Sequence, residues 1–118
     1  MEVKVIEHDQ IARIVADGIL IWDTASFLDL LMAVQQQTGC SKIILERSVI
    51  LEDFFDLKTK LLGDAFQKLV TYDFKLGIVG DFSMYHSKSL KDYIYESNRN
   101  GAACFVQTEQ AAVEWLKR

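Results

Sequence analysis

Apolar and polar residues alternate in the first part of the chain, which predicts β-strands there. The alternation covers residues 2–5 and again residues 11–16. Asp17-Gly18 is a dipeptide typical of hairpin turns, and a short apolar run at residues 19–22 follows it. We therefore expect antiparallel strands that form one edge of a sheet.

Beyond residue 25 the apolar residues recur every three or four positions, and this period predicts helices separated by short buried strands. Helices are expected to begin at Ser26, at Ser48 or Asp53, at Ser87 or Ser89, and at Thr108. Gly39 and Gly101 are the expected ends of two of these helices. Apolar strands are expected at residues 42–46, 75–80 and 102–106.

The alternation of helices and strands predicts an α/β fold. Antiparallel N-terminal strands lead into a mostly parallel sheet with right-handed crossovers, covered by about four helices. No linker, charge block or internal repeat divides the sequence. Residues 1–118 are therefore expected to form one small α/β sandwich.

The composition agrees with a single folded domain. The chain has 118 residues, of which 50% are hydrophobic and 25% are charged, enough for a core of its own. Lys and Arg number 13 against 17 Asp and Glu, so the net charge is -4. A nucleic-acid-binding surface normally needs a basic excess, and the sequence therefore argues against a nucleic-acid partner.

Two features bear on the location of the protein. The start of the chain lacks the basic region and long apolar run of a secretory signal, and no apolar stretch is long enough to cross a bilayer. Cys40 and Cys104 lie far apart without a C-x-x-C pair, which suits a reducing compartment. We expect a cytoplasmic protein without a membrane partner.

The densest polar segment is Gly80–Ser89, directly before an expected helix. Backbone N–H groups at a helix start, together with Ser87, Lys88 and Ser89, are of the kind that hold a phosphate or carboxylate. In the other interpretation, Ser87 or Ser89 only caps the helix and Lys88 is solvated. The first interpretation predicts a sensor for a small anionic metabolite or nucleotide.

Catalytic and metal chemistry receive little support from the sequence. Asp81, Ser83 and His86 are the residue types of a hydrolytic triad, but triad residues are normally gathered from separate elements rather than from one loop. His8 and His86 are the only histidines, and neither has metal-ligand spacing. We expect no metal and no cofactor, and an enzyme acting through these loop residues is the third hypothesis.

The adjacent aromatic residues Phe54 and Phe55 cannot both place their rings on one face of a helix. One ring is expected in the core, and the other either lies beneath a neighbouring loop or is exposed as a contact site. Tyr85 and Tyr95 are candidates for the same contact surface. A homodimer is compatible with exposed aromatic residues, although the spacing does not require one.

Three blocks of sequence resemble a mainly bacterial family known as DUF4180, a domain of unknown function. The blocks are residues 52–57, 79–83 and 87–98, and the resemblance runs nearly end to end. That family has no assigned reaction, so the resemblance implies no particular activity.

The order of the expected elements resembles that of STAS domains, which form the tails of sulphate transporters and the antagonists of anti-sigma factors. Residues 104–116 are similar to the closing strand and helix of these domains. In the antagonists, phosphorylation of a serine after the central strand switches partner binding, and Ser48 matches that position. Arg47 and residues 49–51 stand where the antagonists carry an Asp-Ser-Ser-Gly-like segment.

The leading hypothesis is a STAS-like regulatory module that recognises a protein partner. The expected contact residues are Ser48, Asp53, Asp81, Ser83, Ser87, Lys88 and Ser89. A phosphate on Ser48 would add about two negative charges beside Glu46 and Glu52, which would repel an acidic partner.

Overall fold

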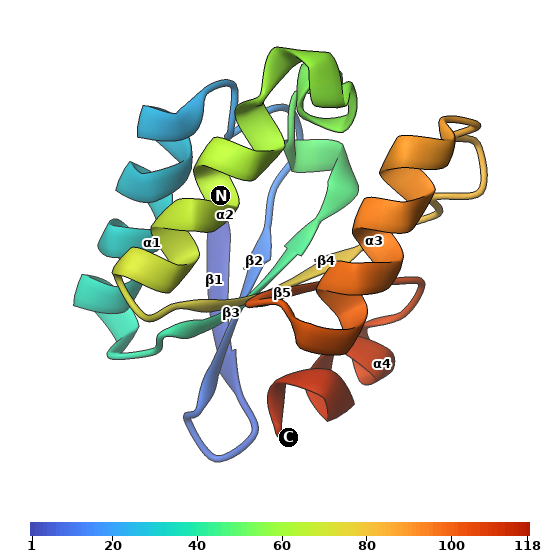
Figure 1. Cartoon of the computed structure of the whole chain (residues 1–118). Helices are drawn as coiled ribbons and strands as arrows, with labels where there is room; N and C mark the ends of the chain where they lie inside the picture. Colours follow the sequence, from blue (N-terminus) through green and yellow to red (C-terminus); the bar gives the residue numbers. More distant parts are fainter.

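The computed structural model describes all 118 residues and contains one five-stranded sheet whose strands follow the order of the sequence (Figure 1). The strands are β1 (Glu2–Ile6), β2 (Ile11–Val15), β3 (Lys42–Glu46), β4 (Lys75–Val79) and β5 (Ala103–Val106). β1 pairs antiparallel with β2, and the other neighbouring strands pair in parallel. This arrangement confirms the predicted α/β fold class.

Four α-helices cover the two faces of the sheet. They are α1 (Thr24–Thr38), α2 (Leu61–Thr71), α3 (Lys88–Asn100) and α4 (Glu109–Leu116). Right-handed crossovers between parallel strands in sequential order place α1, α2 and α3 on one face. α4 packs on the opposite face against β3, β4 and β5, as Figure 1 shows.

The two faces of the sheet bury clusters of different size. The face of α1–α3 carries a core cluster of 22 buried residues, and the α4 face carries one of six. Successive strand residues point to opposite faces, so Ala12 belongs to the larger cluster and Ile11 to the smaller. Gly77 allows α4 to approach closely, because a Cβ atom there would lie 3.0 Å from the Cβ of Ala112.

Most predicted helix ends are confirmed. Ser87 and Thr108 accept hydrogen bonds from the backbone N–H groups of Leu90 and Ala111, and so cap α3 and α4. Gly39 ends α1 with a left-handed φ of 78°, and Gly101 ends α3.

The start of α1 differs from the prediction. Asp23 is its N-cap, and Ser26 is the third helical residue of a reciprocal capping box. The Ser26 hydroxyl accepts from the backbone of Asp23, while the Asp23 carboxylate accepts from the backbone of Ser26. Ser26 therefore takes part in the cap, but the helix begins earlier than expected.

The position predicted for the hairpin turn is wrong. The β1–β2 turn lies at residues 7–10, where Glu7, His8 and Asp9 adopt positive φ angles. Residues 19–22 form no strand, and only Ile21 makes a single parallel bridge, to Ile50. β1 and β3 already occupy both sides of β2, so no free edge is left for a strand after Asp17-Gly18.

The predicted capping of α2 by Ser48 or Asp53 is also wrong. Three short 3-10 helices lie between β3 and α2: η1 (Arg47–Val49), η2 (Glu52–Phe55) and η3 (Leu57–Thr59). α2 begins after Lys60, which has a left-handed φ of 65° and makes no side-chain cap. These short helices have no long apolar period, and the sequence pattern did not indicate them.

Both cysteines are free and buried. Burial raises the pKa of the Cys104 thiol to about 11, so this thiol is protonated at neutral pH. None of the helices is long and apolar enough to span a membrane.

Candidate functional site

The parallel strands place their carboxyl ends along one edge of the sheet, and the polar loops predicted from the sequence follow these ends. Residues 47–60 follow β3, residues 80–87 follow β4, and residues 107–108 follow β5. In open α/β sheets ligands gather at this edge, because the helix N-termini and loops converge there. We call the surface formed by residues 47–53 and 80–89 the carboxyl-end rim.

Arg47 joins the two halves of the carboxyl-end rim. Its Nη1 atom donates to Glu52 Oε1 at 2.8 Å and to the Tyr85 hydroxyl at 3.4 Å. The Tyr85 hydroxyl also donates to the Glu52 carboxylate, at 2.9 Å. This three-residue contact holds η1, η2 and the loop after β4 in one arrangement.

Gly80 makes room for Arg47. A Cβ atom at residue 80 would lie 2.8 Å from the Arg47 Cβ atom, which is closer than side chains tolerate. The Arg47 Nε atom is buried and has no hydrogen-bond partner. Burial of this unpaired N–H group costs free energy, and the hydrogen bonds of Nη1 offset that cost.

Aromatic rings support this contact from below. Phe55 is only 5% exposed and its ring stacks on Tyr85 with centroids 5.3 Å apart. Phe82 lies 6.1 Å from Phe55 and 5.4 Å from Phe105, which continues the aromatic packing into the core. Phe54 is also buried, and so Phe55 takes the predicted position beneath a neighbouring loop.

Tyr85 connects the aromatic and charged parts of the rim. Burial, and then the hydrogen bond to Glu52, raise the pKa of the Tyr85 hydroxyl above its ordinary value. The hydroxyl therefore keeps its proton at neutral pH and remains a donor to Glu52.

Asp81 and Ser83 form a local turn at the carboxyl-end rim. The Ser83 hydroxyl and backbone N–H donate to Asp81 Oδ1 at 2.6 and 2.9 Å. These two bonds, the hydroxyl first, lower the pKa of Asp81. The hydroxyl is thus directed at a carboxylate, and the exposed His86 makes no hydrogen bond with it.

The start of α3 satisfies most of its own polar groups. Ser87 caps the helix, and the Lys88 ammonium pairs with Asp92 at 2.8 Å, one turn further along. Ser89 is exposed without a side-chain hydrogen bond in the protein. Anion binding at Ser87–Ser89 stays a prediction, and such a ligand would compete with Asp92 for Lys88.

Ser48 and Asp53 lie on the outer side of the same rim. Ser48 is exposed in η1, directly after Arg47, and Asp53 is exposed in η2. The backbone carbonyl of Asp53 accepts a hydrogen bond from the Thr59 hydroxyl at 2.9 Å, while its carboxylate is left to solvent. The structure therefore gathers the predicted contact residues at one end of the molecule.

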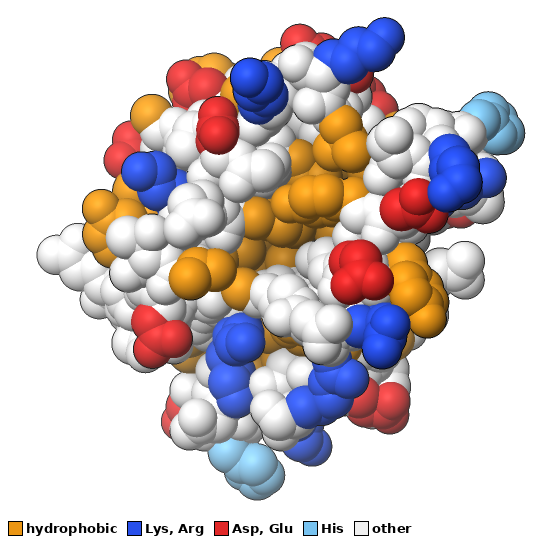
Figure 2. Space-filling view, in the orientation of Figure 1, with side chains coloured by type: hydrophobic (Ala, Val, Ile, Leu, Met, Phe, Trp, Pro, Cys, Tyr) orange, Lys and Arg blue, Asp and Glu red, His pale blue; other side chains and the backbone are white.

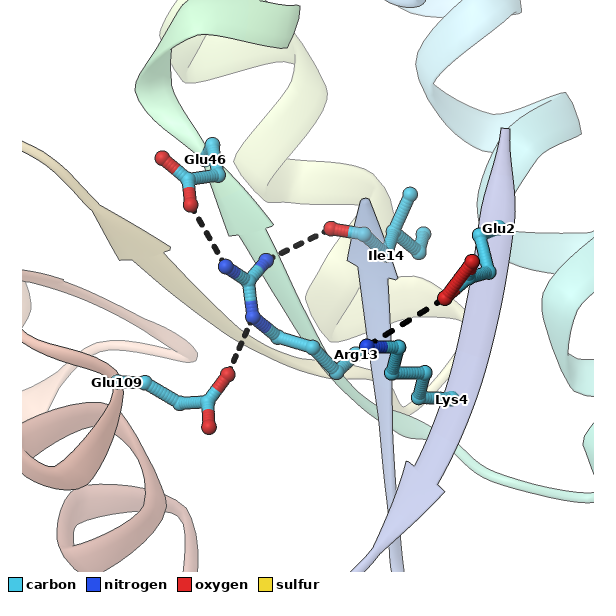
Figure 3. A network of polar contacts seen from close by, with 6 residues as sticks. All are labelled: Glu2, Lys4, Arg13, Ile14, Glu46 and Glu109. Carbon is cyan, nitrogen blue, oxygen red and sulfur yellow. Dashed lines mark hydrogen bonds and ion pairs between the residues drawn. The ribbon is translucent and has the colours of Figure 1, made fainter. Parts of the chain in front are cut away.

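A shallow hollow of about 600 Å³ opens beside the rim on the α4 side of the sheet. Its lining residues are Glu46, Val79, Gly80, Asp81, Ser83 and Gln107. Arg13, whose side chain is 11% exposed, binds Glu46 at 2.6 Å and Glu109 at 2.5 Å (Figure 3). This network holds two carboxylates on one guanidinium and ties α4 to β2 and β3. The chain holds no group of three or more His, Cys, Asp or Glu side chains placed to bind a metal ion.

A second surface, which the sequence analysis did not identify, lies between α2 and α3. Figure 2 shows hydrophobic side chains gathered in a hollow between these two helices. The cavity has a volume of about 380 Å³ and is lined by Gly63, Phe66, Gln67, Val70, Tyr93, Glu96, Ser97, Asn100, Gly101 and Ala102. We call it the α2–α3 groove. On α2 the lining residues are 63, 66, 67 and 70, and on α3 they are 93, 96, 97 and 100. Both sets follow the i, i+3, i+4, i+7 spacing of one helix face, which is the sequence signal that could have indicated the groove.

Comparison with protein families gives one match that covers nearly the whole chain. The model of the family described as a domain of unknown function (DUF4180) matches residues 6–116. Comparison with curated proteins and with solved structures gives no match. The resemblance to STAS domains stays a prediction.

Proposed function

The chain belongs to the DUF4180 family, which has no assigned function. From the geometry of the carboxyl-end rim, we propose that the chain is a regulatory module that recognises a protein partner. The contact of Arg47 with Glu52 and Tyr85 carries this proposal, because it fixes the shape of the rim before any partner binds. A preformed surface loses little side-chain entropy on binding.

The surroundings of this contact support protein recognition. Ser48, Asp53 and Met84 are exposed around it, and Met84 has an exposed fraction of 50%. An exposed methionine beside charged and hydroxyl groups offers both apolar and polar contacts to a partner.

Phosphorylation of Ser48 would control this recognition. The serine is exposed, and the carboxylates of Glu46 and Glu52, two and four positions away, are each paired with an arginine. A phosphate group would add about two further negative charges at the rim. We expect it to repel an acidic partner and to compete with Glu52 for Arg47.

The proposal is tested by affinity capture from the source cell with four forms of the protein. Wild type and Gln36→Glu, which adds the same charge at an exposed position of α1, should capture the same partner. Ser48→Asp and Arg47→Ala should lose it. Equal capture by all four forms would show that the rim does not recognise the partner. If only Arg47→Ala loses the partner, the rim still recognises the partner, but phosphorylation of Ser48 does not control that recognition.

A further inference from the structure

Four of the five polar side chains that line the α2–α3 groove have no partner within the protein. Gln67, Tyr93, Glu96 and Asn100 line the groove, and none of their side chains makes a hydrogen bond or an ion pair. Ser97 differs, since its hydroxyl donates to the carbonyl of Ala103 at 2.6 Å. Gln67, Glu96 and Asn100 are exposed, so these polar groups are free to bind a molecule that enters the groove.

Gly63 lies in the wall of the groove without a structural reason to be glycine. Its φ angle is not positive, and a Cβ atom there would meet nothing within 4 Å. Glycine in a helix costs about 0.5–1 kcal/mol relative to alanine. The missing side chain leaves open space beside Phe66, one turn away on the same face of α2.

The remaining lining sets the chemistry of an occupant. The rings of Phe66 and Tyr93 contact each other, with centroids 5.9 Å apart, and join the two helices in the groove. Val70 is 66% exposed and also lines it. Glu96 is the only charged residue in the lining, which contains no lysine, arginine or histidine. Burial raises the pKa of the Tyr93 hydroxyl, so this residue stays neutral. The cavity volume of about 380 Å³ lies in the range of small-molecule sites.

We propose that the α2–α3 groove binds a small organic ammonium ion that carries an apolar body. The ammonium group donates to the Glu96 carboxylate and to the amide oxygens of Gln67 and Asn100. The apolar body packs on Phe66 and Tyr93, whose ring faces also attract a cation. An anion finds no positive partner in the groove. This inference is independent of partner recognition at the carboxyl-end rim.

The test is an NMR titration of the isotope-labelled protein with phenethylammonium and, separately, with phenylacetate, which has a similar shape and the opposite charge. Phenethylammonium should shift the backbone amides of Gly63, Tyr93 and Asn100, with saturation. Phenylacetate should leave these amides unchanged. Equal affinity for the two probes, or no shift of the groove amides with phenethylammonium, would overturn the proposal.

Three variants locate the binding. Gly63→Leu adds a side chain to the groove at an exposed position where a Cβ atom meets nothing within 4 Å, so it should abolish binding of phenethylammonium without lowering the melting temperature. Glu96→Gln should weaken binding roughly three- to fivefold, as expected for an exposed ion pair. Glu114→Gln makes the same change on α4, outside the groove, and should leave affinity unchanged. Unchanged affinity in Gly63→Leu, in a protein whose spectrum shows it to be folded, would place the probe elsewhere.

Discussion

The carboxyl-end rim and the α2–α3 groove use polar side chains in opposite ways. At the rim, Arg47, Glu52 and Tyr85 bind one another above a buried aromatic layer. In the groove, residues such as Glu96 and Asn100 are left to solvent or to an occupant. A surface whose side chains already bind one another keeps its shape and suits a large partner. Exposed side chains without protein partners are free to bind a small ligand.

The difference arises from how each region is built. The rim consists of short 3-10 helices and a loop, and the absence of a side chain at Gly80 leaves room for Arg47. The groove consists of two regular helices whose facing positions include Gly63 and no charge pair.

Removal of an aromatic ring should lower the free energy of unfolding much more at the rim than in the groove. Phe55→Ala should lower the free energy of unfolding by about 3–5 kcal/mol, because the ring is 5% exposed and packs on Tyr85. Phe66→Ala removes a partly exposed ring and should cost about 1–2 kcal/mol. Denaturant unfolding measures both values, and equal losses would contradict the view of the rim as the buried, preformed region.

The two glycines should respond to alanine with opposite signs. Gly80→Ala should destabilise the fold by about 1–3 kcal/mol, because the new Cβ collides with Arg47. Gly63→Ala should stabilise it by about 0.5–1 kcal/mol, since the position is helical and unobstructed. Thermal unfolding should therefore show melting temperatures that move in opposite directions. A destabilising Gly63→Ala would mean that the glycine has a role in the fold itself.

Neutralising one carboxylate should lower the free energy of unfolding more at the rim than in the groove. Glu52→Gln weakens the contact with Arg47 and should cost about 0.5–1 kcal/mol, given that the pair is partly exposed. Glu96→Gln removes an unpaired charge and should change the free energy of unfolding by less than about 0.5 kcal/mol. Urea unfolding measures the free energy of unfolding of both variants. A larger decrease for Glu96→Gln than for Glu52→Gln would show that Glu96 forms an ion pair, contrary to this prediction.

Asp81 gives the smallest effect, which depends on pH. Its pKa is lowered in the folded protein, so its contribution to stability is present above the ordinary pKa of 3.8 and is lost as pH falls through the folded value. Ser83→Ala removes the principal cause and should raise the pKa of Asp81 toward 3.8. NMR titration of the Asp81 carboxyl carbon in both proteins measures this shift. An identical pKa in the two proteins would rule out the hydroxyl as its cause.

The sequence predicted those features that depend on local pattern. The caps at Ser87 and Thr108 and the strands β3–β5 were recognised because each signal lies within a few residues. The contact of Arg47 with Tyr85 was not predicted, because it joins residues 38 positions apart through the pairing of β3 with β4. The three 3-10 helices escaped detection because they have no sustained period.

The α2–α3 groove was missed for a related reason. The recurrence of apolar residues every three or four positions predicts two separate helices and includes Phe66, Val70 and Tyr93 of the lining. That Phe66 of α2 meets Tyr93 of α3 follows from the order of the strands, which places the two crossover helices side by side on one face. Local periodicity identifies the face of each helix but does not tell which faces meet.

The most direct test of partner recognition at the rim is hydrogen–deuterium exchange of the protein with and without its captured partner. We predict slower exchange in residues 47–56 and 80–90, and unchanged exchange in residues 61–71 and 93–102. Protection confined to the two groove segments, with the rim unchanged, would contradict the proposed function and place the partner on the α2–α3 groove instead.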